Sequence, residues 1–119
     1  MKHYIRTLSL FLFISFAFTQ TQLGSDIDGE AAGDYSGTSV SMNSAGDRVA
    51  IGAMENDGTG EDAGHVRVYE YSNSSWTQLG SDIDGEAAGD FSGRSVSMNS
   101  AGDRVAIGAM ENDGTGTQA

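Results

Sequence analysis

The chain has 119 residues, room for one ordinary domain at most, and its formal net charge of -11 excludes sequence-independent binding to nucleic-acid phosphates. It contains no cysteine, which excludes disulfides, thiolate zinc sites, iron–sulfur clusters and cysteine nucleophiles. Leu, Ile, Val and Phe are scarce, and this composition favours disorder unless their arrangement builds a packed core.

The first 19 residues have the layout of a secretory signal peptide. Lys2 and Arg6 precede the apolar stretch Leu8–Phe18, after which the chain becomes polar. A membrane-spanning helix needs roughly 20 apolar residues, so we expect a helical signal that is removed rather than a retained anchor. A small residue at Ala17 places cleavage there or within the next two positions. The sequence therefore predicts an exported protein, either secreted or held at the cell surface.

The rest of the chain is an internal repeat with a period of 56 residues. Residues 21–60 return as residues 77–116, and only two of these 40 positions differ. Near-identity of this kind indicates a structural module that was duplicated recently. We therefore expect residues 20–119 to form one repeat domain, with a first unit over residues 21–76 and a partial second unit over residues 77–119.

Alternation of apolar and polar side chains within the repeat predicts strands. The first expected strand spans residues 21–27. In the next one, Val40 and Met42 alternate with serines, and the turn Asn43–Asp47 then leads into a strand over residues 48–53. These last two strands are predicted to form a hairpin.

A glycine-rich loop over residues 55–64 separates this hairpin from two further expected strands. Residues 65–71 alternate and are rich in the β-branched and aromatic side chains typical of strands, and Trp76–Leu79 follows after a turn. Residues 93–109 repeat the hairpin in the second unit. The sequence thus predicts an all-β protein of antiparallel four-stranded sheets, and four strands in about 50 residues are typical of a β-propeller blade.

Three stretches resemble the FG-GAP repeats of integrin-alpha-like β-propellers. They are Gly37–Ser41, Val49–Ala53 and Gly64–Tyr69, which contain the spacings Gly-x-Ser-Val, Ile-Gly-Ala and Gly-x-Val-x-Val-Tyr. The chain departs from the family at two landmarks, because Ser36–Gly37 replaces Phe-Gly and Gly52–Met54 replaces Gly-Ala-Pro. The resemblance implies propeller blades and a role in cell adhesion or in binding an extracellular protein or glycan.

The expected fold is an incomplete propeller of one full blade plus parts of two, preceded by the signal-peptide helix. Residues 20–119 would supply about one and three-quarter blades, whereas propellers close with roughly 4 to 8. Closure would need further blades or other copies of the chain. Three explanations stay open: a piece of a longer protein, which we favour, head-to-tail assembly of copies, or poor folding.

Acidic side chains recur at equivalent places in both units and are the candidate metal ligands. Oxygen-rich loops with glycine suit calcium, which takes six to eight oxygen ligands. In integrin-like blades the calcium loop lies between the first two strands, but here that place holds only Asn43–Asp47, so the family's own site is not carried over. The alternative is solvated charge that keeps an exported protein soluble. The candidates are Asp26, Asp28, Glu30, Asp34, Asp82, Asp84, Glu86 and Asp90.

The sequence offers two further groups of candidate residues. His65 is the single histidine after the signal, and no motif singles out a serine for a catalytic relay, so a polar strand residue is the preferred interpretation. Tyr69, Tyr71 and Trp76 could stack on sugars, but such aromatic side chains more often pack a blade.

We therefore expect an exported, non-catalytic propeller segment that has no cofactor other than calcium. Its partner would be an extracellular protein or glycan, without nucleic acid and without a membrane span after signal removal. The competing hypothesis is the propeller part of a secreted hydrolase whose catalytic residues lie in further blades. A third hypothesis is purely structural repeat material.

Overall fold

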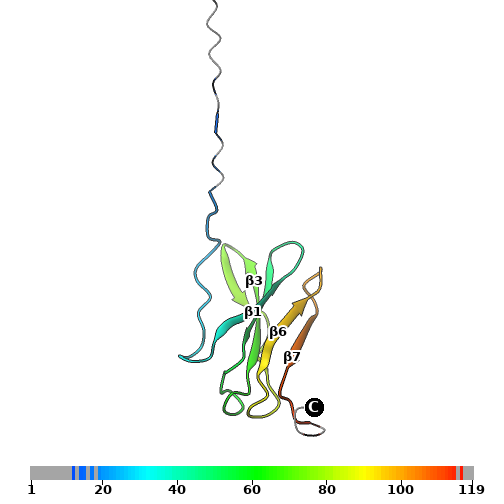
Figure 1. The fold of residues 1–119 in the computed structure, drawn as a ribbon. Helices are drawn as coiled ribbons and strands as arrows, with labels where there is room; N and C mark the ends of the chain where they lie inside the picture. Colours follow the sequence, from blue (N-terminus) through cyan, green and yellow to red (C-terminus); the bar gives the residue numbers. More distant parts are fainter. Residues whose placement is uncertain (1–11, 13, 16, 18, 115, 117–119) are drawn as a thin grey trace, which may run out of the picture.

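The computed structural model describes residues 12, 14, 15, 17, 19–114 and 116, and this part of the chain is all-β, with no helix (Figure 1). The prediction of antiparallel sheets is confirmed. The strands are β1 (Ser36–Met42), β2 (Arg48–Ala53), β3 (His65–Ser72), β4 (Ser75–Gln78), β5 (Ile83–Asp84), β6 (Ser92–Met98) and β7 (Val105–Ala109).

The predicted signal-peptide helix over residues 1–19 falls mainly on residues outside the described part, so it stays a prediction. Where the structure does describe the chain, it contains no helix of the length and apolarity that crossing a bilayer requires.

The four strands of the first unit form one antiparallel sheet in the order β1-β2-β3-β4. Asn43 closes the β1–β2 turn, because its Oδ1 accepts hydrogen bonds from the backbone N–H groups of Asp47 (3.1 Å) and Arg48 (2.9 Å). A two-residue loop joins β3 to β4, and both Asn73 and Ser74 have positive φ (51° and 63°), as a type I′ hairpin turn requires. The predicted four-stranded unit is therefore present, with its last strand one residue earlier than expected.

The predicted strand over residues 21–27 is wrong. Residues 19–35 contain no strand, although residues 77–90, which are identical to residues 21–34, contribute to β4 and β5. Both β4 and β5 pair with β3, which belongs to the first unit. Among the described residues there is no earlier counterpart of β3, and so no neighbouring strand there completes a ladder of hydrogen bonds with residues 21–28. Strand β5, with two residues, was not expected from the sequence.

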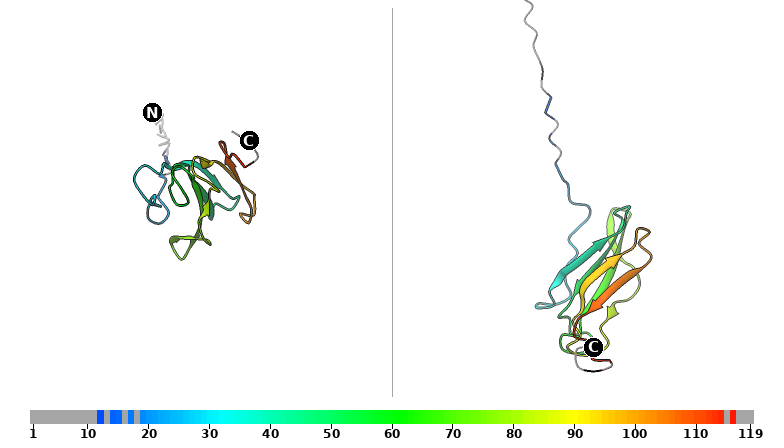
Figure 2. Two further views of the ribbon diagram at one scale, coloured as in Figure 1. Left: turned by 90° about the horizontal axis from the view of Figure 1, so that it is seen from below. Right: turned by 45° about the vertical axis from the view of Figure 1, so that its right-hand side comes forward.

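The second unit packs face to face on the first. Strands β6 and β7 repeat the β1–β2 hairpin as a separate two-stranded sheet, and β6 lies against both β1 and β2 (Figure 2). Ser39 Oγ donates a hydrogen bond of 2.6 Å to the Gly93 carbonyl oxygen across this interface. Ser41 Oγ accepts another, of 2.9 Å, from the backbone N–H of Met98. The stacking therefore depends on short side chains and close backbone approach.

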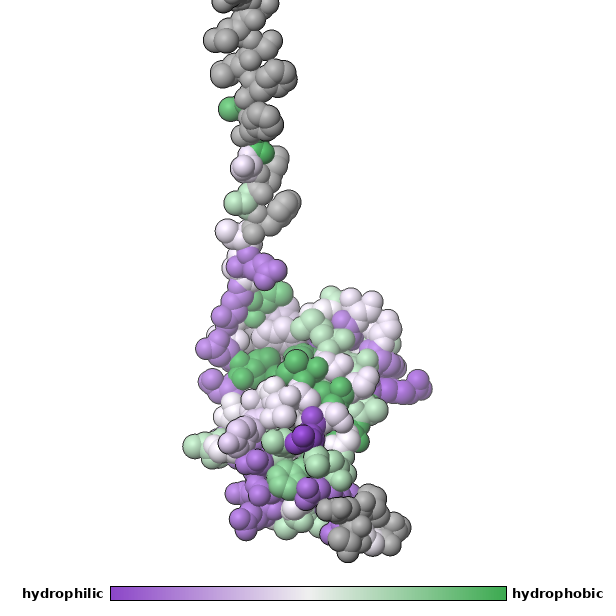
Figure 3. Space-filling view, in the orientation of Figure 1, coloured by the Kyte–Doolittle hydropathy of each residue, from purple (hydrophilic) through white to green (hydrophobic). Residues whose placement is uncertain are grey.

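The core is small and lies around β2 and β3. Its buried apolar residues, within the described part, are Val49, Ala50, Ala53, Ala63 and Val66. Larger apolar side chains lie at the surface, and Figure 3 shows apolar surface across the middle of the folded part. The two sheets leave this apolar surface uncovered. The grouping of the units into propeller blades stays a prediction.

Candidate functional site

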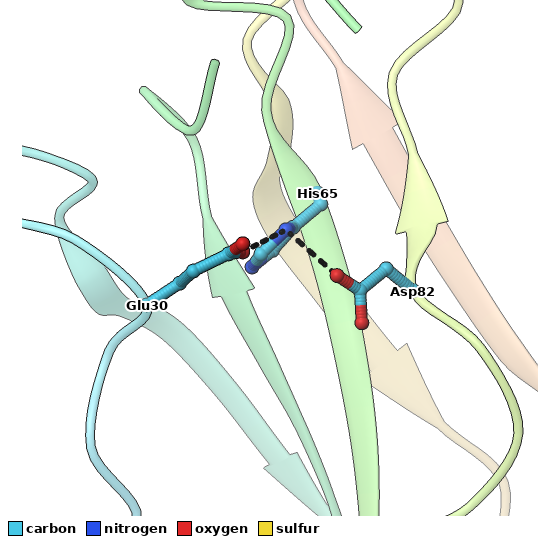
Figure 4. A group of neighbouring side chains, drawn as sticks. All are labelled: Glu30, His65 and Asp82. Carbon is cyan, nitrogen blue, oxygen red and sulfur yellow. Dashed lines mark ion pairs between the residues drawn. The ribbon is translucent and has the colours of Figure 1, made fainter. Parts of the chain in front are cut away.

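Four charged or titratable side chains from three separate segments meet at one end of β3. His65 and Arg67 are two residues apart on β3 and therefore point to the same face of the sheet. Glu30 comes from the loop before β1, and Asp82 from the segment between β4 and β5. Figure 4 shows Glu30 and Asp82 on either side of the His65 ring. The pairing of β5 with β3 brings Asp82 here, since β5 starts at the next residue.

Arg67 holds the two carboxylates together. Its Nε and Nη2 donate hydrogen bonds of 2.8 and 2.7 Å to the two Asp82 oxygens, and Nη2 also donates to Glu30 Oε2 at 2.7 Å. Gln78 Nε2 donates a further bond of 2.7 Å to Asp82 Oδ1. The bond from Arg67 lowers the pKa of Asp82 to about 2, although burial opposes this, and the same bond raises the pKa of Arg67. Asp82 is thus a permanent anion at neutral pH.

His65 is the least satisfied member of the cluster. The residue is 3% exposed, and its Nδ1 has no hydrogen-bond partner. This atom lies 3.7 Å from Asp82 Oδ2 and 3.9 Å from Glu30 Oε2. The three ligand atoms lie within 4.8 Å of one another and offer one nitrogen and two oxygens. Arg67 Nη2 already bonds to both oxygens, so a metal ion would have to displace a guanidinium, and we interpret the cluster as an internal charge network.

A second polar arrangement occurs twice, once in each unit. Asn56 Nδ2 donates to Asp34 Oδ2 (2.8 Å) and to Glu30 Oε2 (3.3 Å). Fifty-six residues later, Asn112 Nδ2 donates to Asp90 Oδ2 (3.0 Å) and to Glu86 Oε2 (3.2 Å). The two groups line pockets of about 240 and 230 Å³ respectively. Equivalent pockets on successive units form a short array.

The two asparagines are functional candidates that the sequence analysis missed. Asn56 is buried, and the aspartates that it and Asn112 bind, Asp34 and Asp90, are buried too. The available signal was the repetition of an asparagine and two acids at the same spacing, but repetition alone does not show which side chains converge. Only the position of the loops after β2 and β7 brings each asparagine to its acids.

The structure divides the eight predicted metal ligands instead of gathering them. Glu30 contacts the groups around Asp34 and Asp82, and Glu86 shares Asn112 with Asp90. Asp26 accepts a hydrogen bond from Gln22 within its own segment, while Asp28 and Asp84 are exposed. Calcium binding stays a prediction. Thermal melts with and without calcium test it, and an unchanged midpoint at millimolar calcium would remove it.

The aromatic side chains pack against the segment that precedes β1. Tyr71 and Trp76 lie with ring centroids 5.2 Å apart at an angle of 54°. Trp76 Nε1 donates a hydrogen bond of 2.9 Å to the Leu23 carbonyl oxygen. This contact favours the packing interpretation of these residues over a free stacking platform for sugars.

Comparison of the chain with protein-family models, with curated proteins and with solved structures found no match. The resemblance to FG-GAP repeats therefore stays a prediction that rests on the three stretches quoted above.

Proposed function

We propose that the chain is an exported, non-catalytic repeat segment that serves extracellular adhesion by binding a protein or glycan. The observation that carries this proposal is the duplicated pocket formed by Glu30, Asp34 and Asn56 in one unit and by their counterparts in the next. The exposed carboxylates of Glu30 and Glu86 at these pockets suit the hydroxyl groups of a glycan or the polar side chains of a protein. Repetition supports avidity, because two weak sites on one chain bind a repeating ligand more tightly than one.

The state of the titratable groups supports a non-catalytic role. A general acid needs a pKa close to the working pH, whereas the pKa of Asp82 is lowered to about 2. Arg67 donates hydrogen bonds to both Asp82 oxygens, so this carboxylate has no oxygen without a strong donor from which to move a proton. A secreted hydrolase remains the alternative, and its catalytic residues would have to lie elsewhere.

We also infer that the units are blades of a β-propeller. Supporting this are the consecutive order β1-β2-β3-β4 and the face-to-face stacking of β6 on β1 and β2. A further support is β5, which lies between the units in the chain and pairs with β3 of the first. Small-angle scattering from a chain extended by further repeats would test the inference, because a closed propeller is compact and an open stack is elongated.

The binding proposal is tested with the exported chain on arrays of glycans and extracellular proteins. Ligands found there are then measured against the single variants Glu30→Gln and Glu86→Gln and the double variant. We expect each single change to weaken binding and the double change to weaken it by roughly 100-fold or more, since avidity is lost. Equal binding by wild type and double variant would contradict the proposal, as would turnover of a bound glycan. Circular dichroism controls for folding.

Export is tested separately. Residues 1–30 fused to a reporter enzyme that is active only outside the cytoplasm should deliver the reporter. Replacing Leu10 and Leu12 with glutamate interrupts the apolar stretch and should retain the reporter inside the cell. Delivery by both fusions, or by neither, would contradict the prediction of a signal peptide.

A further inference from the structure

The hairpin of each unit has two chemically different faces. Opposed residues in the β1–β2 register share a face, so Ser39 and Ser41 lie with Gly52 and Ala50, and Val40 and Met42 lie with Ile51 and Val49. We call these the serine face and the valine face of the first unit. The same register in β6–β7 gives the second unit a serine face of Ser95, Ser97, Ala106 and Gly108, and a valine face of Val96, Met98, Val105 and Ile107.

The interface between the units joins the serine face of the first unit to the valine face of the second. Met98 and Val105 line a small pocket together with Val68, which pairs with Ala50 and so belongs to the serine side of the sheet. The serine hydroxyls bond to the backbone of β6, as described above. Arg48 Nη1 adds a hydrogen bond of 3.0 Å to the Gly102 carbonyl oxygen.

In the described part of the chain, the serine face of the second unit and the β1 half of the valine face of the first unit are left uncovered, whereas Val49 on the β2 half is buried. On the valine face of the first unit, Val40 is 62% exposed and Met42 is 52% exposed. On the serine face of the second unit, Ser95, Ser97 and Ala106 are exposed, whereas the corresponding Ala50 is fully buried. The free serine face and the free valine face carry the same residue types as the serine face and the valine face that pack together in the internal interface.

The glycines of the interface confirm that both free faces are open. In the internal interface, a β-carbon on Gly52 would collide with the Gly93 carbonyl oxygen. Gly37, the counterpart of Gly93, has no atom within 4 Å of its β-carbon position. Gly108, the counterpart of Gly52, meets only atoms of Ser95 in its own unit. The positions that are filled by the neighbouring unit at Gly52 and Gly93 are therefore open at Gly108 and Gly37.

We propose that a second copy of this chain covers these faces, with the serine face of the second unit of one copy packed on the valine face of the first unit of the next. The contact is head to tail, so a pair of copies still has one free face of each kind and can bind further copies. The internal contacts then have counterparts between copies: Ser95 Oγ donates to the Gly37 carbonyl oxygen, and Ser97 Oγ accepts from Met42 N–H. This assembly does not depend on the proposed binding function.

Continuity with the internal interface argues for this occupant. Only two residues differ between the repeated stretches, and these place Tyr35 where the internal interface has Phe91 and Thr38 where it has Arg94. Arg94 contacts the sulfur of Met54 at 3.8 Å, and a threonine there removes that contact without adding a charge. We expect a dissociation constant on the order of 100 μM, as for a small interface.

The test is sedimentation velocity of the whole exported chain from about 10 μM to 1 mM, with 0.5 M salt to screen its negative charge. We expect the mean mass to rise with concentration. Val40→Glu blocks only the valine face and Ser97→Glu only the serine face, so each variant alone should stay monomeric. An equimolar mixture should form one-to-one pairs, because each variant supplies the face that the other has lost. Ser72→Glu adds the same charge at an exposed site away from both faces and should associate like wild type.

A wild-type chain that stays monomeric up to 1 mM overturns the proposal. So does a mixture of the two variants that does not pair, because that result indicates a different contact. Thermal melts control for folding, and Met42→Glu with Ala106→Glu provides a second pair of variants on the same two faces. Association of the chain only with an unrelated protein, and not with itself, also overturns it.

Discussion

Gly52 and Gly93 meet where the two sheets stack, and the Gly93 carbonyl oxygen occupies the place that a β-carbon on Gly52 would need. Gly93 has a φ of +87°, a conformation that glycine adopts without strain and that larger residues avoid. The backbones can approach this closely only because neither residue has a side chain. The two glycines therefore set the distance between the units.

Gly52→Ala should destabilise the protein by about 2 kcal/mol or more, because the added methyl group must push the second sheet away. Gly108→Ala is the matched control, since its methyl group meets only the Ser95 side chain, whose hydroxyl can rotate. We expect the control to cost less than about 1 kcal/mol. Urea unfolding of the three proteins measures the difference. Equal costs at both positions would contradict the stacking described here.

Val66 is the largest side chain that is fully buried among the described residues. Val66→Ala should lower the free energy of unfolding by about 1 to 3 kcal/mol, because it removes buried apolar surface and leaves a cavity. Val40→Ala removes the same atoms at a position that is 62% exposed and should change stability by less than about 0.5 kcal/mol. Chemical denaturation at low protein concentration compares the two. A larger loss at Val40 would mean that another surface covers it in solution.

Asp82 predicts a pH dependence of stability. Its pKa is lowered from 3.8 to about 2 in the folded chain, so its contribution is present above pH 4 and is lost as the pH falls from 4 toward 2. Asp82→Asn should cost about 1 to 2 kcal/mol at pH 7, and this cost should shrink as the pH approaches 2. The exposed Asp84→Asn is the control. Unfolding curves at pH 7, 4 and 2.5 test the prediction, which fails if the cost of Asp82→Asn is independent of pH.

Asn56 and Asn112 allow one substitution to be compared in two environments. Asn56 is 4% exposed and holds the buried Asp34, whereas Asn112 is only partly buried. Asn56→Ala should cost about 1 to 3 kcal/mol, because it leaves a buried carboxylate without its donor, and Asn112→Ala should cost less. Thermal and urea unfolding measure both. The reverse order would show that the second unit, not the first, is the better ordered of the two.

Much of the local structure could be predicted from the sequence. Alternation in β1, β2 and β3 and the turns at Asn43–Asp47 and Asn73–Ser74 depend on neighbouring residues only, and all of them lie where expected. These features are local because a strand's side-chain alternation and a turn's φ angles are set within a few residues.

Only part of the candidate site could be predicted from the sequence. The acids were recognised, but Arg67 was not connected with Glu30 and Asp82, which lie 37 and 15 residues away in the chain. Spacing along the chain carries no information on such contacts. The loops that hold Glu30 and Asp82 are placed by packing and by the pairing of β5 with β3, and neither is a local property.

The sequence by itself determined where strands can form, where the chain turns and that it consists of two nearly identical units. Only the tertiary structure decided which of these segments become strands, as the shared stretch Thr21–Glu30 and Thr77–Glu86 demonstrates. The second occurrence contributes to β4 and β5 and the first to no strand, although the residues are the same. The reason is that a strand is completed by the hydrogen bonds of its neighbour, and β3 is a neighbour to the second occurrence only.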